Sequence, residues 1–352
     1  MNTLHHIKHI LAVLAALLLI NSCDSFVYDY EKDCTVYYRL KFRYDMNLKF
    51  ADAFAHEVKS VRLFAFNQAG ELVWQGTEQG DILASSDYLM TLPLAPGKYR
   101  LIAWCGLGGE ESFSLTDAAP KCKPEDLHCI MNALLNATSG TSFDEISEVC
   151  SNNDLQPLFH GIMDVELPVN NDGGEYFYEM QLTKDTNVFR VVLQHLSGED
   201  VNPDDFEFRI EDNNVWLAHD NSLFKEVPLV YHPWAVYTSE AGVEIERTIT
   251  NVKAAVAEFT VNRLFMKDWK LSNKPMLVVR AKSEGKDLVR IPIIDYALLV
   301  KGEHHRQMDN QEYLDRADEY NMTFFLDENN RWVSTVINIL SWRVVVNHSD
   351  LD

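Results

Sequence analysis

The amino-acid sequence predicts an all-β protein that folds as two tandem antiparallel β-sandwiches with a few short helices. Short segments in which apolar and polar residues alternate recur along the chain, and turn residues separate them about every 8–12 residues. At about 150 residues per domain, the 352 residues correspond to two domains. Many short strands with few helical segments favour sandwiches over a parallel α/β sheet.

The first predicted strand covers residues 35–44. Apolar side chains from Val36 to Tyr44 alternate with others that include Arg39 and Arg43, and this period of two is typical of a half-buried strand. Proline and glycine predict a turn at 94–98, and an Asn-Asn-Asp-Gly-Gly run predicts another at 170–174. Further strands of the first half are predicted at 58–66, 99–104, 159–167 and 176–182.

A second unit begins near residues 183–185, so the sequence predicts an N-terminal sandwich over 23–183 and a C-terminal sandwich over 184–352. Residues 106–157 break the strand pattern, and we expect a polar insertion there with a short helix at 124–135. A surface helix is predicted at 309–319 with Asp309 as its N-cap. Strands of the second half are predicted at 188–196, 206–211, 254–264, 276–281, 288–293, 298–300, 322–326 and 332–346.

The N-terminus has the features of a lipoprotein signal peptide over residues 1–22. An apolar run at 10–20 follows Lys8, and as a helix it would span about 16 Å, short of a hydrocarbon core of about 30 Å. Residues 19–23 resemble a bacterial lipobox that ends at Cys23. We expect Cys23 to be acylated, for example with palmitate, and to hold the protein in the membrane through several acyl chains. The alternative is an ordinary secretory signal with a chance cysteine.

The charge of the chain excludes some partners. With 31 basic and 53 acidic residues the formal charge is 31 − 53 = −22. A phosphate backbone requires a basic surface, so we do not expect nucleic acid as a partner. Anionic lipid head groups are disfavoured for the same reason, and membrane attachment is therefore expected to be covalent or hydrophobic.

Six cysteines are present, and one of them is Cys23. The other five are an odd number, which in an exported chain allows at most two disulfides and one free thiol. Their pairing is open; two of them flank the predicted helix at 124–135 and could pair with each other or fasten that segment to the sandwich. No Cys-x₂-Cys spacing occurs, so no metal site is predicted. The disulfide candidates are Cys34, Cys105, Cys122, Cys129 and Cys150.

No motif in the sequence predicts catalysis or a cofactor. No dinucleotide or P-loop glycine pattern and no nucleophile elbow is present. Adjacent histidines at 304–305 are expected to lie in a solvated loop, since neighbours on a strand point to opposite faces. Carboxylates such as Asp204, Asp205 and Asp295 are expected by chance in a chain with 53 acids. Aromatics at 231–237, with Tyr231 and Trp234 foremost, could form a sugar-stacking platform or cover a corner of the sandwich.

A series of short motifs resembles the FimB-type fimbrial anchor lipoproteins of the Bacteroidales. The resemblance covers nearly all of the mature chain, in a constant order of motifs. It is carried by residues 33–36, 42–47, 51–54, 57–64, 103–106, 158–161, 193–198, 294–296, 311–316, 319–325 and Trp342.

The resemblance implies two transthyretin-like, Greek-key sandwiches on an outer-membrane lipid anchor at the base of a fimbrium (pilus). It implies a non-enzymatic role in cell adhesion: the subunit attaches the fibre, joins the shaft subunit (a fimbrillin) by strand addition, and limits fibre length. We expect the strand at 35–44 to stay uncut and to fill its own sheet, and the run at 332–346 is a candidate docking edge. The alternatives are a fimbrial tip or accessory adhesin and a surface glycan-binding lipoprotein.

Overall fold

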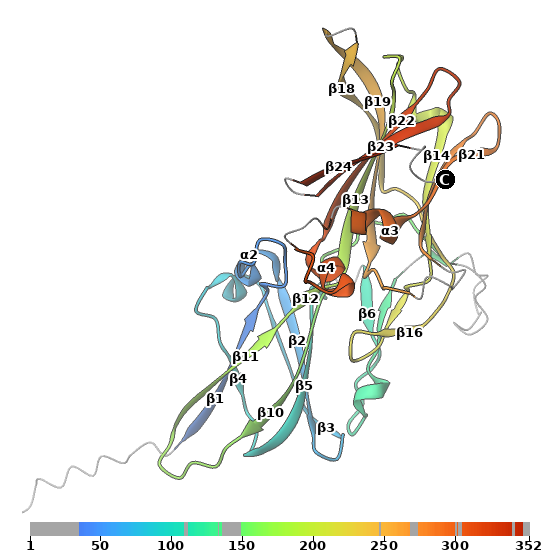
Figure 1. Cartoon of the computed structure of the whole chain (residues 1–352). Helices are drawn as coiled ribbons and strands as arrows, with labels where there is room; N and C mark the ends of the chain where they lie inside the picture. Colours follow the sequence, from blue (N-terminus) through green and yellow to red (C-terminus); the bar gives the residue numbers. More distant parts are fainter. Residues whose placement is uncertain are drawn as a thin grey trace, which may run out of the picture.

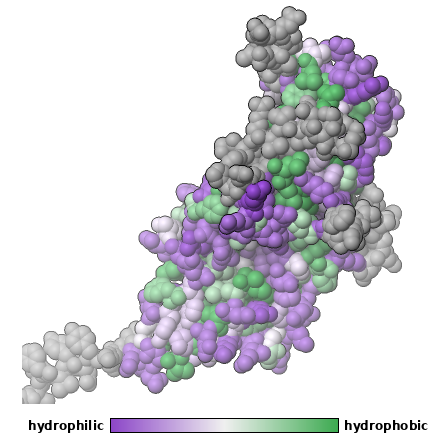
Figure 2. Space-filling model, in the orientation of Figure 1, coloured by the Kyte–Doolittle hydropathy of each residue, from purple (hydrophilic) through white to green (hydrophobic). Residues whose placement is uncertain are grey.

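The computed structural model describes residues 35–108, 112–132, 134–135, 149–245, 248–267, 274–299, 301, 305–339 and 342–347. These residues form five β-sheets and a few short helices (Figure 1). Most strand pairs are antiparallel, so the predicted all-β class is confirmed. Hydrophilic residues predominate on the face shown in Figure 2, in keeping with the acidic composition.

Two sheets form the N-terminal sandwich. Their inner faces enclose a core that includes Leu40, Phe42, Leu63, Leu101 and Phe159. The three-stranded sheet has the order β11 (Gly174–Gln181), β1 (Val36–Arg43), β4 (Met90–Leu92). The five-stranded sheet has the order β12 (Thr183–Lys184), β10 (Phe159–Leu167), β5 (Gly97–Cys105), β2 (Ser60–Asn67), β3 (Leu72–Gln79).

Two six-stranded sheets form the C-terminal sandwich. Phe189, Phe259 and Phe324 of one sheet share a core with Phe208 and Leu277 of the other. The first sheet has the order β18 (Ala235–Ile245), β19 (Thr248–Asn262), β13 (Thr186–His195), β22 (Glu319–Leu326), β23 (Trp332–Ile339), β24 (Trp342–Asn347). The second has the order β21 (Lys286–Pro292), β20 (Met276–Ala281), β14 (Phe206–Asp212), β17 (Leu229–Tyr231), β9 (Val149–Ser151), β8 (Leu134–Leu135).

A four-stranded sheet lies against the outer face of the five-stranded sheet. Phe64 and Trp104, on that outer face, share the C-terminal core cluster with Phe113 and Met131. Its order is β16 (Leu223–Lys225), β15 (Trp216–Leu217), β7 (Cys129–Met131), β6 (Phe113–Leu115). The predicted insertion at 106–157 thus pairs with strands of the C-terminal half. The domain division at 183/184 stays a prediction.

The helices are short and lie at the ends of strands. The predicted helix with Asp309 as N-cap is confirmed: the Asp309 side chain accepts a hydrogen bond from the Gln311 amide at 2.8 Å. Two other predictions are wrong. Residues 298–299 belong to a helix rather than a strand, and the segment 124–135 is helical only in its first turn, after which β7 and β8 follow. The helices are α2 (Phe54–Glu57), α3 (Ile293–Leu299) and α4 (Asn310–Arg316), with 3₁₀ turns η1 (Asp81–Ala84), η2 (Pro124–Asp126) and η4 (Pro203–Asp205).

Candidate functional site

The first strand occupies the centre of the three-stranded sheet. β1 pairs in parallel with β11 over its whole length, from Val36 opposite Gly174 to Arg43 opposite Gln181, and antiparallel with β4. The side chains of Leu40 and Phe42 are buried in the N-terminal core. Because β1 is bonded on both sides, a chain without it would leave a groove between β11 and β4.

Ion pairs fasten the outer face of β1 to β11. Arg39 pairs with Glu175 at 3.1 Å, and Arg43 pairs with Glu179 at 2.9 Å. The hydrogen bond to Glu179 raises the pKa of Arg43 above its ordinary value, and the charge of Asp45 adds to this. The arginines of the first strand, at which a trypsin-like protease would cut, are therefore both engaged in the folded protein.

Lys184 connects the two halves of the chain. Its ammonium group donates to Glu57 of the N-terminal half at 3.0 Å and to Asp318 of the C-terminal half at 2.7 Å. Burial lowers the pKa of Lys184, but the carboxylates of Asp318 and Glu57 outweigh that effect and the net pKa is raised. Lys184 is therefore charged at neutral pH and holds both carboxylates.

A second connection joins the loop after β1 to α4. The Leu48 amide donates to the Arg316 carbonyl at 3.1 Å, and the Arg316 guanidinium donates to the Asp45 carbonyl at 3.0 Å. The same guanidinium lies over the Phe50 ring, 4.8 Å from its centroid. The two connections fix β1 relative to the C-terminal sandwich.

A buried polar cluster lies beside Lys184. The Asp185 carboxyl, which has no exposed surface, accepts a hydrogen bond from the Asn221 amide at 2.7 Å. Arg263 lies 3.9 Å from Asp185 and makes a two-pronged pair with Asp315 at 2.8 and 2.7 Å. Burial raises the pKa of Asp185 to about 7, although Arg263 and Asn221 act in the opposite direction. No substrate could reach this carboxyl, so its role is structural.

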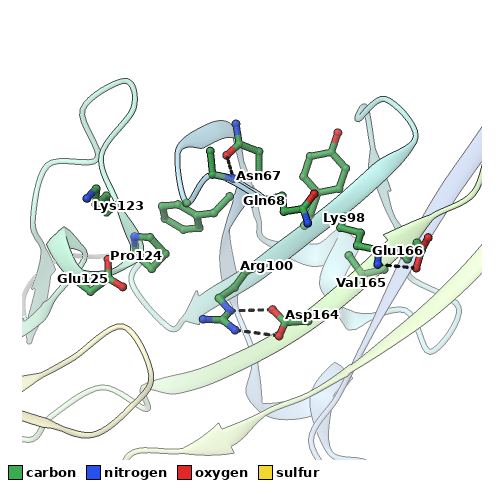
Figure 3. Close-up of a pocket in the computed structure, with 14 residues that line it drawn as sticks. Asn67, Gln68, Lys98, Arg100, Lys123, Pro124, Glu125, Asp164, Val165 and Glu166 are labelled. Atoms are coloured by element: carbon green, nitrogen blue, oxygen red, sulfur yellow. Dashed lines mark hydrogen bonds and ion pairs between the residues drawn. The ribbon is translucent and has the colours of Figure 1, made fainter.

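A pocket of about 750 Å³ opens on the outer face of the five-stranded sheet, beside η2 (Figure 3). The guanidinium of Arg100 and the carboxylate of Asp164 form a two-pronged pair across its floor, at 2.8 and 2.9 Å. The hydrogen bond from Arg100 lowers the pKa of Asp164. Lys98 lies 3.7 Å from Glu166 beside them. The acidic and basic groups of the floor neutralise one another, so the pocket does not favour a charged ligand.

The cysteines predicted as disulfide candidates are only partly described. Cys23 and Cys34 lie outside the described residues. Cys105 and Cys129 are buried and Cys122 is half-buried, and none of the three forms a disulfide with another described cysteine. Burial raises the pKa of the Cys105 and Cys129 thiols, which makes them poor nucleophiles. Lipidation of Cys23 and the pairing of the other cysteines stay predictions.

The residues considered for other chemistry are dispersed. His305 stacks against Phe50, and no group of three metal-ligating side chains occurs in the described ranges. Asp295 pairs with Lys274 at 2.6 Å. Asp204 and Asp205 belong to the turn η4.

The aromatic segment at 231–237 divides between core and surface. Tyr231 is buried, and its hydroxyl bonds to Asn214 at 2.7 Å, so it cannot belong to a stacking platform. Trp234 and Tyr237 are exposed. They lie at the start of β18, an edge strand that the sequence patterns did not single out.

The domain junction has only a weak signal in the sequence. A charged pair, Lys184-Asp185, stands between two apolar strands, but its partners lie far away along the chain. Over the part of the chain that is described, no helix is long and apolar enough to cross a membrane.

Comparison with known proteins identifies the family. The family model of fimbrillin-A associated anchor proteins Mfa1 and Mfa2 matches residues 30–348. A solved candidate adhesin from Bacteroides thetaiotaomicron VPI-5482 is 32% identical, with 89% of this chain and 98% of that chain covered and a TM-score of 0.73. A candidate polysaccharide-binding protein from the same strain is 26% identical, with 89% and 99% covered and a TM-score of 0.71.

The fimbrial anchor protein Mfa2 from Porphyromonas gingivalis has the same fold. It is 15% identical, with 89% of this chain and 99% of that chain covered and a TM-score of 0.60. No curated protein matches the chain. Because the family model covers most of the sequence, the chain belongs to the fimbrillin-A associated anchor proteins, a family of structural components of fimbriae.

Proposed function

We propose that this protein is a non-enzymatic outer-membrane lipoprotein that anchors a fimbrium to the cell surface and limits its length. The observation that carries the proposal is the match to the anchor-protein family over residues 30–348. Acylated Cys23 would hold the base of the fibre in the membrane. The partner at the other end would be the shaft subunit, a fimbrillin, joined by strand addition.

The position of β1 supports the anchoring role. β1 begins at Val36, only a short distance along the chain from Cys23, and its outer arginines are paired with Glu175 and Glu179. A force applied at the lipidated end would be transmitted to the N-terminal core through β1, which is hydrogen-bonded to a neighbouring strand on each side. A sheet that is filled by its own first strand offers no groove there for a further subunit, so the fibre ends at this protein.

The test uses the full chain in its host. The gene is deleted and restored as wild type, as Cys23→Ala, or as Cys122→Ala, a matched cysteine substitution away from the predicted lipid site. We expect Cys23→Ala to release fibres into the medium or to lengthen them, and Cys122→Ala to behave as wild type. Fibres of normal length that stay attached in the Cys23→Ala strain would overturn the anchoring role.

A second candidate function is that of an accessory adhesin. Two observations favour it: the likeness to the Bacteroides proteins described as a candidate adhesin and as a candidate polysaccharide-binding protein, and the neutral pocket beside Arg100 and Asp164. Paired carboxylate and guanidinium groups can bond to the hydroxyls of an uncharged glycan. In that case, loss of the gene would reduce adhesion to glycan-coated surfaces while fibres remain attached.

A further inference from the structure

β18 is an edge strand, and its outer backbone groups have no partner strand among the described residues. It is the end strand of a six-stranded sheet and pairs with β19 through eleven consecutive positions, from Ala235 opposite Glu258 to Ile245 opposite Thr248. The register runs without a bulge. At about 3.3 Å per residue the eleven residues offer an edge of about 36 Å.

β18 lacks most of the usual protections of a sheet edge. Proteins blunt edge strands by shortness, bulges, proline or charged residues, lysine above all, because a free edge is a template for another strand. β18 contains no lysine, arginine or proline, and its first five residues, 235–239, carry no charge; Glu240 and Glu244 follow in its second half. The other described edge strands offer less. β3 and β21 carry register shifts, β11 and β24 are shorter than β18, with eight and six residues, and the remaining ones, β4, β6, β8, β12 and β16, have only two or three residues.

Large apolar side chains are exposed on both faces at the start of β18. Trp234, Val236 and Tyr237 have exposed fractions of 38%, 45% and 37%. Val236 and Tyr237 point to opposite faces, since successive side chains of a strand alternate. The Tyr237 hydroxyl donates to Glu258 of β19 at 2.7 Å, which holds its ring on the sheet. An added strand would therefore bury apolar surface on both sides of the sheet.

The location of β18 fits an occupant from outside the anchor. The β18–β19 hairpin projects from the end of the molecule opposite to the start of β1 (Figure 1). In the proposed function the membrane lies on the side of the start of β1, because lipidated Cys23 precedes that strand. A strand that adds to β18 therefore approaches from the side away from the membrane. The free main-chain edge selects an extended polypeptide, since small ligands do not use a row of alternating donors and acceptors.

We propose that β18 is the docking strand for the next fimbrial subunit, which adds an extended segment to it and continues the six-stranded sheet. The inference rests on the proposed anchoring function and names the surface that such anchoring uses. Main-chain hydrogen bonds along the strand supply affinity, and the exposed side chains at 234–237 set the register.

The first test compares two valine substitutions in cells, Val236→Lys on β18 and Val169→Lys. Val169 has an exposed fraction of 73% and lies in the turn between β10 and β11, near the opposite end. A lysine at position 236 would lie where the added strand binds, and we expect it to lower the binding free energy by as much as the loss of an interface hot spot. Val236→Lys should therefore release about tenfold or more fimbrillin into the medium than wild type does. The membrane level of the anchor should stay at the wild-type value, and Val169→Lys should retain its fibres.

A photo-crosslinking amino acid at position 236, compared with one at 169, gives a second measurement that does not depend on a destabilising substitution. We expect a crosslink to fimbrillin from position 236 only. Retained fibres in Val236→Lys, together with release by Cys23→Ala, would overturn the docking strand and leave the anchoring function intact. Retained fibres in both variants would overturn both. A crosslink from position 236 to a second copy of this chain would show that the edge serves self-association instead.

Discussion

The buried pair of Asp185 and Asn221 has two oxygen atoms without a hydrogen-bond donor among the described residues. The Asn221 amide donates to one carboxyl oxygen of Asp185, while Asp185 Oδ2 and Asn221 Oδ1 are buried and have no hydrogen-bond partner among the described residues. Both are acceptors when Asp185 is ionised, and a single proton on Oδ2 would turn one of them into a donor. The cause of the raised pKa of Asp185 is its burial, and the two unpartnered acceptors are consistent with a protonated carboxyl.

We predict that Asp185→Asn changes the pH dependence of stability. The folded pKa of about 7 lies above the unfolded one, so the stability linked to Asp185 is fully present at low pH and is lost as pH rises through about 7. Relative to wild type, Asp185→Asn should therefore gain about 2–3 kcal/mol in free energy of unfolding between pH 5 and pH 8. Urea titrations at several pH values measure the difference.

Comparing Asp185→Asn with wild type also cancels the effect of His160 on the pH dependence of stability, because both proteins contain His160. Burial lowers the pKa of His160 to about 3, so its contribution to stability is lost as pH falls below the ordinary histidine value. This loss opposes the gain from Asp185, and it is common to both proteins. A stability difference that stays constant from pH 5 to pH 8 would show that Asp185 is not protonated in the folded chain.

The sequence predicts the burial of single residues well where that burial follows from the alternation of apolar and polar residues along one strand. Alternation alone placed Tyr38, Leu40 and Phe42 inside, and all three are buried. It could not predict Asp185, because the groups that permit its burial, Asn221 and Arg263, are brought to it only by the tertiary fold.

At the level of elements, β1 should contribute strongly to the N-terminal sandwich. Leu40 is fully buried between β1 and the five-stranded sheet, whereas Lys41 points to the other face. We predict that Leu40→Ala lowers the free energy of unfolding by about 3 kcal/mol, because it removes buried methyl groups and leaves a cavity. Lys41→Ala should stay within about 0.5 kcal/mol of wild type. Equal effects of the two substitutions in thermal unfolding would mean that β1 is not held in its sheet.

The two wrong element predictions have different causes. The segment Ile293–Leu299 is a short apolar run, and such runs fit a buried strand or a buried helix equally well. Residues 129–131 follow a proline-led turn that suggested a helix, but they pair with β15, more than eighty residues later in the chain. Only for residues 129–131 is the deciding partner remote in sequence.

At the scale of the whole molecule, the two sandwiches share a core. Phe64 and Trp104 from the N-terminal half lie in the same buried cluster as Phe189 and Phe259 from the C-terminal half, and Lys184 spans the junction between Glu57 and Asp318. A force applied between the lipidated end and the far sheet would pass through this junction. We therefore expect the halves to unfold together in the wild-type protein.

Lys184→Met tests this coupling. The substitution leaves Glu57 and Asp318, whose side chains are only 35% and 30% exposed, without their shared cation. We predict a loss of about 1–3 kcal/mol in the free energy of unfolding. We also expect the two halves to unfold at different urea concentrations, which hydrogen exchange of β5 in one half and of β22 in the other would follow. Lys98→Met is the control, because Lys98 and Glu166 are exposed by 61% and 70% and such pairs contribute about 0–1 kcal/mol. Separate transitions already in the wild type, or no difference between the two variants, would mean that the two sandwiches unfold independently of each other.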